Sequence, residues 1–488
     1  MKKIALYLIA TIATLALAAQ GNGTMSIRYG SKVKKFDYQM AHSCRIAAER
    51  NGELYMVTQS TKKILGNPIP TGLQLVVTDT NLNVLRTLQI ADKMIWEAQA
   101  VNYVDGKVYV LCHMGPLYMR QELDPISMTK VKEEKVALFE GGENDNFYDF
   151  VSQSENRDFC ALVGVTVSNT ANEYNQKQYL LDDKFNILWE KKYDASLLTG
   201  VVVTDEGVVY TMGSHYNPTT QETSFIVSEL DVDKERTMVE SKHMGMVDYT
   251  VPLNAKNGIV VGAGYIKSPK SKKNDLYDSY FGVAFNTRTQ QLSTSVQPIT
   301  SDELNVLGNK NNNRTNSEGV ADALIVSAKQ KTQFGGVLVL QRSWSVTRCN
   351  NKTGCTTTVY VMGTLAFGVD TTGAIVWHKP FRTNTQSGQD NFINIQTASI
   401  GDNFYLIQPE HKRAPETYDI SKATWLVPIY RKHADALYKV DKDGNVEKLL
   451  GLSKEKGSMM GRLHKRDNGK YYAIRCTMTK SLMCYVEL

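Results

Sequence analysis

The chain has 488 residues, of which 42% are hydrophobic and 22% are charged, and its formal net charge is +6 at pH 7. This composition is that of a globular protein with enough apolar residues for a large core, and it excludes collagen-like and extensively disordered classes. So small a charge for this length argues against a nucleic-acid partner, because proteins of that class concentrate positive charge on one surface.

The first 19 residues have the pattern of a secretory signal peptide. Lys2 and Lys3 are followed by an apolar run over residues 4–17 and by small residues before Gln20. The run is shorter than the roughly 20 apolar residues that a spanning helix needs, which favours cleavage over a membrane anchor. No cysteine stands at the cleavage point, and no later segment is apolar for long enough to span a membrane. The protein is therefore predicted to be exported to the periplasm, the outer surface or the medium, with no transmembrane segment after cleavage.

The seven cysteines can be oxidised in an exported chain, and two pairs of them are candidate disulfides. Cys349 and Cys355 flank the turn-rich stretch "NNKTG" and form the first candidate pair. Cys476 and Cys484 are equally far from Lys480, so a hairpin that turns there would place them opposite each other as a second pair. The other three lie in apolar runs and are expected to be buried thiols: Cys44, Cys112 and Cys160.

A polar turn followed by an apolar strand recurs along the chain with a period of about 50 residues. Gly52 and Gly106, in two of these turns, are 54 residues apart, and Gly207 and Gly258 are 51 residues apart. Repeats of this length are typical of solenoids, propellers and arrays. Eight copies are found, and they begin at Arg50, Val104, Glu155, Thr204, Ala255, Phe334, Ile400 and Arg466.

A second signature follows most copies, in which a strand ends in an acidic or amide residue and a short turn leads to another strand. The stretches "LVVTDTNLNVLRTLQI" and "LAFGVDTTGAIVWHKPF" are two examples. In the second, Asp370 and Thr372 can cap a tight turn, Gly373 can take a positive φ and Trp377 can pack between neighbouring repeats. Each repeat is thus predicted to supply about four short strands in hairpin succession.

An all-β protein built from such units is predicted to be a β-propeller. Strands such as "GGVLVLQ" are apolar at consecutive positions, which indicates that both of their faces are covered. Neighbouring blades in a closed ring provide that cover and remove the exposed sheet edges. The last repeat lacks one strand, and the segment 24–36 contains a lone strand that is predicted to pair with it and close the ring. The count gives eight four-stranded blades, with seven as the alternative if two units merge.

Residues 20–488 are predicted to form this single domain, with insertions at about 267–279, 301–320 and 410–433. Long insertions carry the binding surface in many scaffolds, although they can also be neutral additions. The third is rich in aromatic and basic residues, and its candidate ligand-binding residues are Trp425, Tyr430, Arg431 and His433. The alternative is that Trp425 packs onto a neighbouring blade.

No catalytic or metal-binding motif is found in the sequence. The histidines lack metal-ligand spacing, and neither a nucleophile elbow nor a phosphate-binding loop occurs, so no metal and no cofactor are predicted. His113, His215 and His411 follow the same strand of their repeats, which would place them at one end of the ring.

Two acidic stretches contain the residue types of calcium or acid–base sites. Glu143, Asp145 and Asp149 lie close together in a connection, where such residues are usually solvated. The stretch from Asp441 begins like a calcium loop, but Gly444 comes too early for that motif.

Two stretches, "LDDKFNILWEKKY" and "VDTTGAIVWHKPF", resemble the repeat of quinoprotein-type propellers. The shared pattern is an apolar residue, Asp, a turn, an apolar pair and Trp. The resemblance implies a propeller blade. The quinone dehydrogenases of that family also carry two adjacent cysteines at the cofactor, and this chain has no such pair. No quinone is therefore expected.

The region from Asp322 to Asp390 is similar to exported propeller-like proteins of Bacteroidota that have no assigned activity. This resemblance implies a role in the cell envelope or outside the cell and supplies no catalytic residues. Two hypotheses follow. The leading one is a non-catalytic binding or scaffold module for an envelope protein or glycan. The alternative is a glycan-active hydrolase or lyase with carboxylates at the propeller channel, since propellers can assemble such sites from distant loops.

Overall fold

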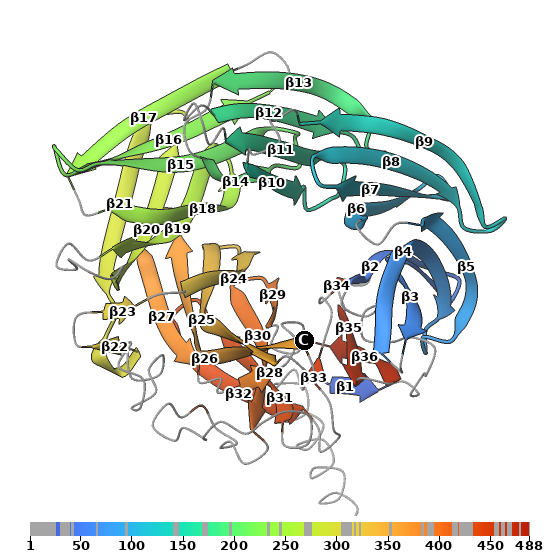
Figure 1. Cartoon of the computed structure of the whole chain (residues 1–488). Coiled ribbons are helices and arrows are strands. Elements are labelled where there is room, and N and C mark those ends of the chain that lie inside the picture. The colour runs from blue at the N-terminus through green and yellow to red at the C-terminus, as the bar shows by residue number, and fades with distance from the viewer. Residues whose placement is uncertain are drawn as a thin grey trace, which may run out of the picture.

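In the computed structural model the chain forms β-sheets arranged in a ring (Figure 1). The structure describes residues 26–29, 40, 43–64, 67–92, 96–139, 146–167, 174–194, 198–231, 235–243, 246–267, 276–303, 315–316, 319–321, 324–350, 354–381, 385–387, 395–411, 418, 433–452, 458–459, 464–465, 471–477 and 480–487. The predicted signal peptide lies outside these residues. Within them, no helix has the length and apolar character needed to cross a membrane.

Seven blades are each built from four antiparallel strands that follow one another in the chain. The first four are β2 (Arg45–Arg50), β3 (Glu53–Ile64), β4 (Asn67–Asp79) and β5 (Val84–Ala91); β6 (Glu97–Val104), β7 (Lys107–Met114), β8 (Leu117–Asp124) and β9 (Thr129–Leu138); β10 (Asn146–Gln153), β11 (Cys160–Val167), β12 (Tyr174–Leu181) and β13 (Ile187–Asp194); and β14 (Leu198–Val203), β15 (Val209–Asn217), β16 (Glu222–Leu230) and β17 (Glu235–His243).

The remaining three blades include the longest strands of the ring. They are β18 (Val247–Lys256), β19 (Ile259–Lys267), β20 (Leu276–Asn286) and β21 (Gln291–Pro298); β24 (Leu324–Lys331), β25 (Gly335–Asn350), β26 (Gly354–Asp370) and β27 (Ile375–Phe381); and β29 (Gln396–Ile400), β30 (Asn403–His411), β31 (His433–Val440) and β32 (Val446–Leu452). Short strands extend two of these sheets: β22 (Thr315–Asn316) and β23 (Gly319–Ala321) beside β20, and β28 (Thr385–Ser387) beside β26.

An eighth, closing sheet joins the two ends of the chain. β1 (Ser26–Tyr29) pairs with β36 (Lys480–Glu487), which pairs with β35 (Tyr471–Thr477). The short strands β33 (Ser458–Met459) and β34 (His464–Lys465) pair with the other edge of β35. The prediction of a propeller closed by an N-terminal strand is confirmed. The seven blades of consecutive strands fit the alternative count, and the closing sheet is an additional, eighth sheet of the ring.

Packing between blades explains the consecutive apolar residues of the inner strands. In β11, "CALVGVTV", every residue except the last is buried. Its even and odd positions belong to different clusters: Cys160 and Leu162 pack with the second blade, and Ala161 and Val163 pack with the fourth. Outer strands such as β9 are mostly exposed and polar, since only one edge of each blade lies inside the ring.

The turn that begins at Asp370 has the predicted geometry. The Asp370 Oδ1 atom accepts hydrogen bonds from the backbone N–H groups of Thr372 (2.8 Å) and Ala374 (3.0 Å), and Gly373 has a φ of 84°. Trp377 is 4% exposed and packs against Phe404 of the next blade. Three other blades repeat this carboxylate-capped turn, at Asp79, Asp182 and Asp441. The Asp441 carboxylate is therefore a turn cap.

The strand register places one predicted cysteine pair directly opposite and the other out of step. Cys349 lies directly opposite Cys355 at the tip of the β25–β26 hairpin, and the disulfide between them stays a prediction. The expectation that Cys476 lies opposite Cys484 is wrong, because Cys476 pairs with Ser481 in the β35–β36 hairpin. The hairpin turns one to two residues before Lys480, which puts the two cysteines three residues out of step and on opposite faces of the sheet.

The other three cysteines are buried free thiols, as expected, and burial raises the pKa of each to about 12: Cys44, Cys112 and Cys160.

Deletion of residues 24–36 is expected to lower the melting temperature, because the closing sheet loses an edge strand and the ring opens. A fall of roughly 5 °C or more is expected by differential scanning calorimetry. Deletion of residues 20–23 alone, which precede β1, is the control. An unchanged melting temperature after the longer deletion would contradict closure by β1.

Candidate functional site

The connections at the two ends of the ring differ in length. Because strands within a blade are antiparallel, the second-to-third and blade-to-blade connections leave at one end, and the other connections leave at the opposite end. At the second end, here called the turn face, every connection is short, from two to six residues. The first end is called the insertion face.

All three predicted insertions fall on the insertion face. Residues 267–279 cover the β19–β20 connection, 301–320 lie between β21 and β24, and 410–433 lie between β30 and β31. The long β25–β26 hairpin also extends toward this face, and β22, β23 and β28 add to its sheets. The elaboration is therefore concentrated over the fifth, sixth and seventh blades.

The predicted ligand-binding residues are mostly not placed by the structure. Trp425, Tyr430 and Arg431 lie outside the described residues. His433 is the first residue of β31 and pairs in register with His411. Between His411 and His433 the structure describes Tyr418, which was not among the predicted ligand-binding residues.

Tyr418 fastens the third insertion to β27. Its hydroxyl group donates a 2.8 Å hydrogen bond to the carbonyl oxygen of Pro380. Its ring packs against Phe381, with ring centroids 5.6 Å apart, and meets Tyr438 edge-on at 6.1 Å. Burial raises the pKa of the Tyr418 phenol, so the group is a neutral donor at physiological pH.

The start of the second insertion is fastened to the same strand. Glu303, whose side chain is 3% exposed, lies 2.6 Å from His378 Nδ1. Its other oxygen accepts hydrogen bonds from the backbone N–H and hydroxyl groups of Thr300 at 2.7 and 2.9 Å. Burial alone would raise the pKa of Glu303, but His378 and Thr300 outweigh it, and the pKa is held below its ordinary value. Tyr280 packs beside His378 with ring centroids 5.2 Å apart.

A second constellation lies between the second and third blades, beside their innermost strands. His113 Nδ1 is 3.4 Å from Asp149, and its Nε2 atom is 3.7 Å from Glu97 and 2.8 Å from the amide of Gln99. The buried hydroxyl group of Tyr118 donates a hydrogen bond to Asp149. Burial lowers the pKa of His113, but the carboxylates of Glu97 and Asp149 outweigh it and the net pKa is raised. A partly exposed histidine is thus held between two carboxylates.

The predicted acidic group is only partly placed, because Glu143 and Asp145 lie outside the described residues. Asp149 belongs to the His113 constellation. His113, His215 and His411 all lie near the ends of second strands, β7, β15 and β30, at the insertion face as expected. Among the described residues, no group of three or more His, Cys, Asp or Glu side chains is arranged to hold a metal ion.

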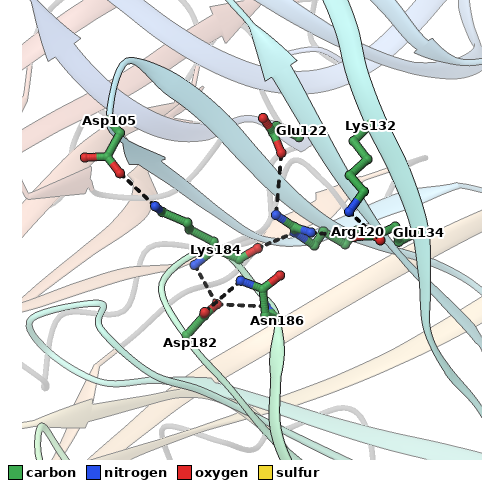
Figure 2. A network of polar contacts seen from close by, with 8 residues as sticks. All are labelled: Asp105, Arg120, Glu122, Lys132, Glu134, Asp182, Lys184 and Asn186. Carbon is green, nitrogen blue, oxygen red and sulfur yellow. Dashed lines mark hydrogen bonds and ion pairs between the residues drawn. The ribbon is translucent and has the colours of Figure 1, made fainter.

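A polar network on the other side of the same interface holds these two blades together (Figure 2). The guanidinium group of Arg120, 8% exposed, donates to the carbonyl oxygen of Lys184 at 2.6 Å and to Glu134 at 2.5 Å. Lys184 in turn forms an ion pair with Asp105 at 2.7 Å. These contacts join turns of both blades near the turn face, so we assign them a structural role.

No family model matches the chain, and no curated protein matches it. Solved structures with a similar arrangement of strands include a Dos1 propeller, with a TM-score of 0.43 and 8% identity over 94% of this chain and 95% of that one. The polysaccharide lyase Uly1 has a TM-score of 0.38 and 10% identity over 94% and 99% of the two chains. An oligogalacturonate lyase in complex with manganese has a TM-score of 0.37 and 10% identity over 96% and 98%. Structural similarity at this level does not indicate a function.

Replacing Glu303 with Gln is expected to lower the free energy of unfolding by about 2 kcal/mol at pH 7, because a buried charged hydrogen bond is lost. The lowered pKa of Glu303 means that its contribution is present above the ordinary carboxyl pKa and is lost as the pH falls through the lowered value. The difference between the two proteins should therefore shrink below about pH 4 in urea unfolding measured across pH. Glu206→Gln, in an exposed turn, is the control, and a difference independent of pH would contradict the role given to this carboxylate.

Proposed function

We propose that the protein is an exported, non-catalytic propeller that binds an envelope protein or glycan through the insertion face over its fifth to seventh blades. The observation that carries the proposal is the attachment of two insertions to one strand: Glu303 contacts His378, and Tyr418 contacts Pro380. Both attachment points lie within β27, so Glu303 and Tyr418, one residue from each insertion, are held by the same strand. A composite surface of this kind suits a large ligand, and the aromatic and basic residues of 410–433 supply suitable contacts for a protein or sugar.

The contrast between the two faces supports this choice. On the turn face the side chains of Asp79, Asp182, Asp370 and Asp441 are occupied in capping their own turns. On the insertion face, buried Glu303 and half-buried Tyr418 attach residues of the two insertions to β27. Because ordering these segments costs conformational entropy, their attachment by specific contacts favours a function for them.

Replacement of residues 412–432 by a short Gly-Ser linker is expected to weaken binding by at least about tenfold, a loss of 1.4 kcal/mol or more. Binding would be measured with a partner isolated by affinity pull-down from the native envelope or identified on a glycan array. His378→Ala is expected to weaken it as well, because one attachment of the second insertion is lost. The double variant Lys442→Ala and Asp443→Ala, on the turn face, should bind normally. Binding that is lost only in the turn-face variant would overturn the assignment.

The His113 constellation favours a second candidate, a glycan-active hydrolase or lyase with carboxylates beside the channel. A histidine between Asp149 and Glu97 supplies the acid and base groups that cleavage of a glycosidic bond requires. The buried Tyr118 hydroxyl would hold Asp149 in place rather than touch a substrate.

Incubation with a panel of polysaccharides distinguishes the candidates. The non-catalytic proposal expects no cleaved product by chromatography. Product that forms with the wild-type protein and with Asp205→Asn, on the turn face, but is lost with Asp149→Asn would establish the enzyme instead.

A further inference from the structure

The His113 constellation joins the innermost strands of two neighbouring blades. β6 of the second blade and β10 of the third lie side by side on the inner side of the ring (Figure 1). His113, near the end of β7, places Nδ1 3.4 Å from Asp149 on β10 and Nε2 3.7 Å from Glu97 on β6. One imidazole ring therefore faces two carboxylates, which belong to different blades.

The other titratable groups near this ring, Tyr118 and Cys160, are neutral at physiological pH. Tyr118, on β8, packs beside the imidazole with ring centroids 5.2 Å apart, and its hydroxyl group donates a hydrogen bond to Asp149. Burial and the charge of Asp149 raise the pKa of this phenol, so it keeps its proton. Burial raises the pKa of the Cys160 thiol, on β11, to about 12. Near neutral pH the imidazole is the group of this set whose charge changes.

The number of N–H groups on the ring depends on its protonation. A neutral imidazole has one N–H group, and when Nδ1 carries it, Nε2 accepts a hydrogen bond from the Gln99 amide at 2.8 Å. Protonation adds a hydrogen at Nε2, which faces Glu97, and the amide of Gln99 can turn its oxygen toward it. Charged hydrogen bonds are about 2.7–2.9 Å long, so both carboxylate contacts have room to shorten around the cation.

We propose that the His113 constellation is a pH-dependent clamp, which draws β6 and β10 together when the imidazole is protonated and loosens that contact when it is neutral. Burial alone would lower the pKa of His113, but Glu97 and Asp149 outweigh it and the net pKa is raised. The clamp is therefore fully present below the unfolded value of about 6.5 and is lost as the pH rises through the higher, folded value. It belongs to the ring itself and does not depend on binding through the insertions.

Hydrogen–deuterium exchange, measured by mass spectrometry on peptides from β6 and β10, tests the clamp. His113→Gln, which cannot become a cation, is expected to exchange about threefold or more faster than the wild type in both strands at about pH 5.5. The ratio of the two rates should fall toward one at about pH 9. Comparison at the same pH removes the effect of pH on the intrinsic exchange rate. His215→Gln, exposed near the end of β15, is the matched control and should give a ratio near one at both pH values.

A histidine titration gives a second test that needs no His113 variant. The NMR signal of the His113 imidazole in the wild-type protein is expected to titrate above about pH 6.5, and Asp149→Asn should lower its midpoint. A midpoint at or below that of an ordinary histidine would overturn the proposal. An exchange ratio that is the same at both pH values would overturn it as well, because His113 would then act through packing alone.

Discussion

Antiparallel pairing between β1 and β36 is the interaction on which packing around the ring depends. It joins Ser26–Tyr29 to Cys484–Glu487, the two ends of the described chain. Each blade buries both of its faces only because it has a neighbouring blade on each side. An open ring would leave two blades with one uncovered face each. A short strand pair thus completes the structure that keeps the apolar strands of all the blades out of water.

Within that closed ring, the two faces are under different physical constraints. The turn face is built from short connections, and four blades use the same carboxylate-capped turn, with a residue of positive φ at its fourth position: Leu82, Phe185, Gly373 and Gly444. The insertion face has no such uniformity, and its connections reach 25 residues between β21 and β24. Variation in the length and composition of the connections is therefore concentrated on the insertion face.

The sequence was sufficient for the features that depend on local pattern. Strand periodicity, the repeat length and the turn at Asp370 are each encoded within a few consecutive residues, and the propeller, its closing strand and the place of Trp377 followed from them. The hairpin between Cys476 and Cys484 was misplaced because its register depends on where the turn begins, which a symmetric spacing does not determine.

Contacts between side chains of different blades could not be predicted from local sequence patterns. Glu303 and His378 are 75 residues apart, so their contact could not be read from spacing. One local signal was available for Glu303. The order Thr300, two residues and Glu303 is that of a capping box, and the structure has its reciprocal hydrogen bonds. That signal marks the carboxylate as fixed but does not identify His378 as its partner.

The position of β27 has an evolutionary consequence. Trp377, near the start of this strand after the Asp370 turn, packs against the seventh blade. His378 and Pro380, which follow it, contact the two insertions. A substitution that shifts β27 therefore acts on the ring and on two surface segments together. Across related chains, residues 303, 378 and 418 are expected to change in concert, whereas insertion residues without such an attachment are free to diverge.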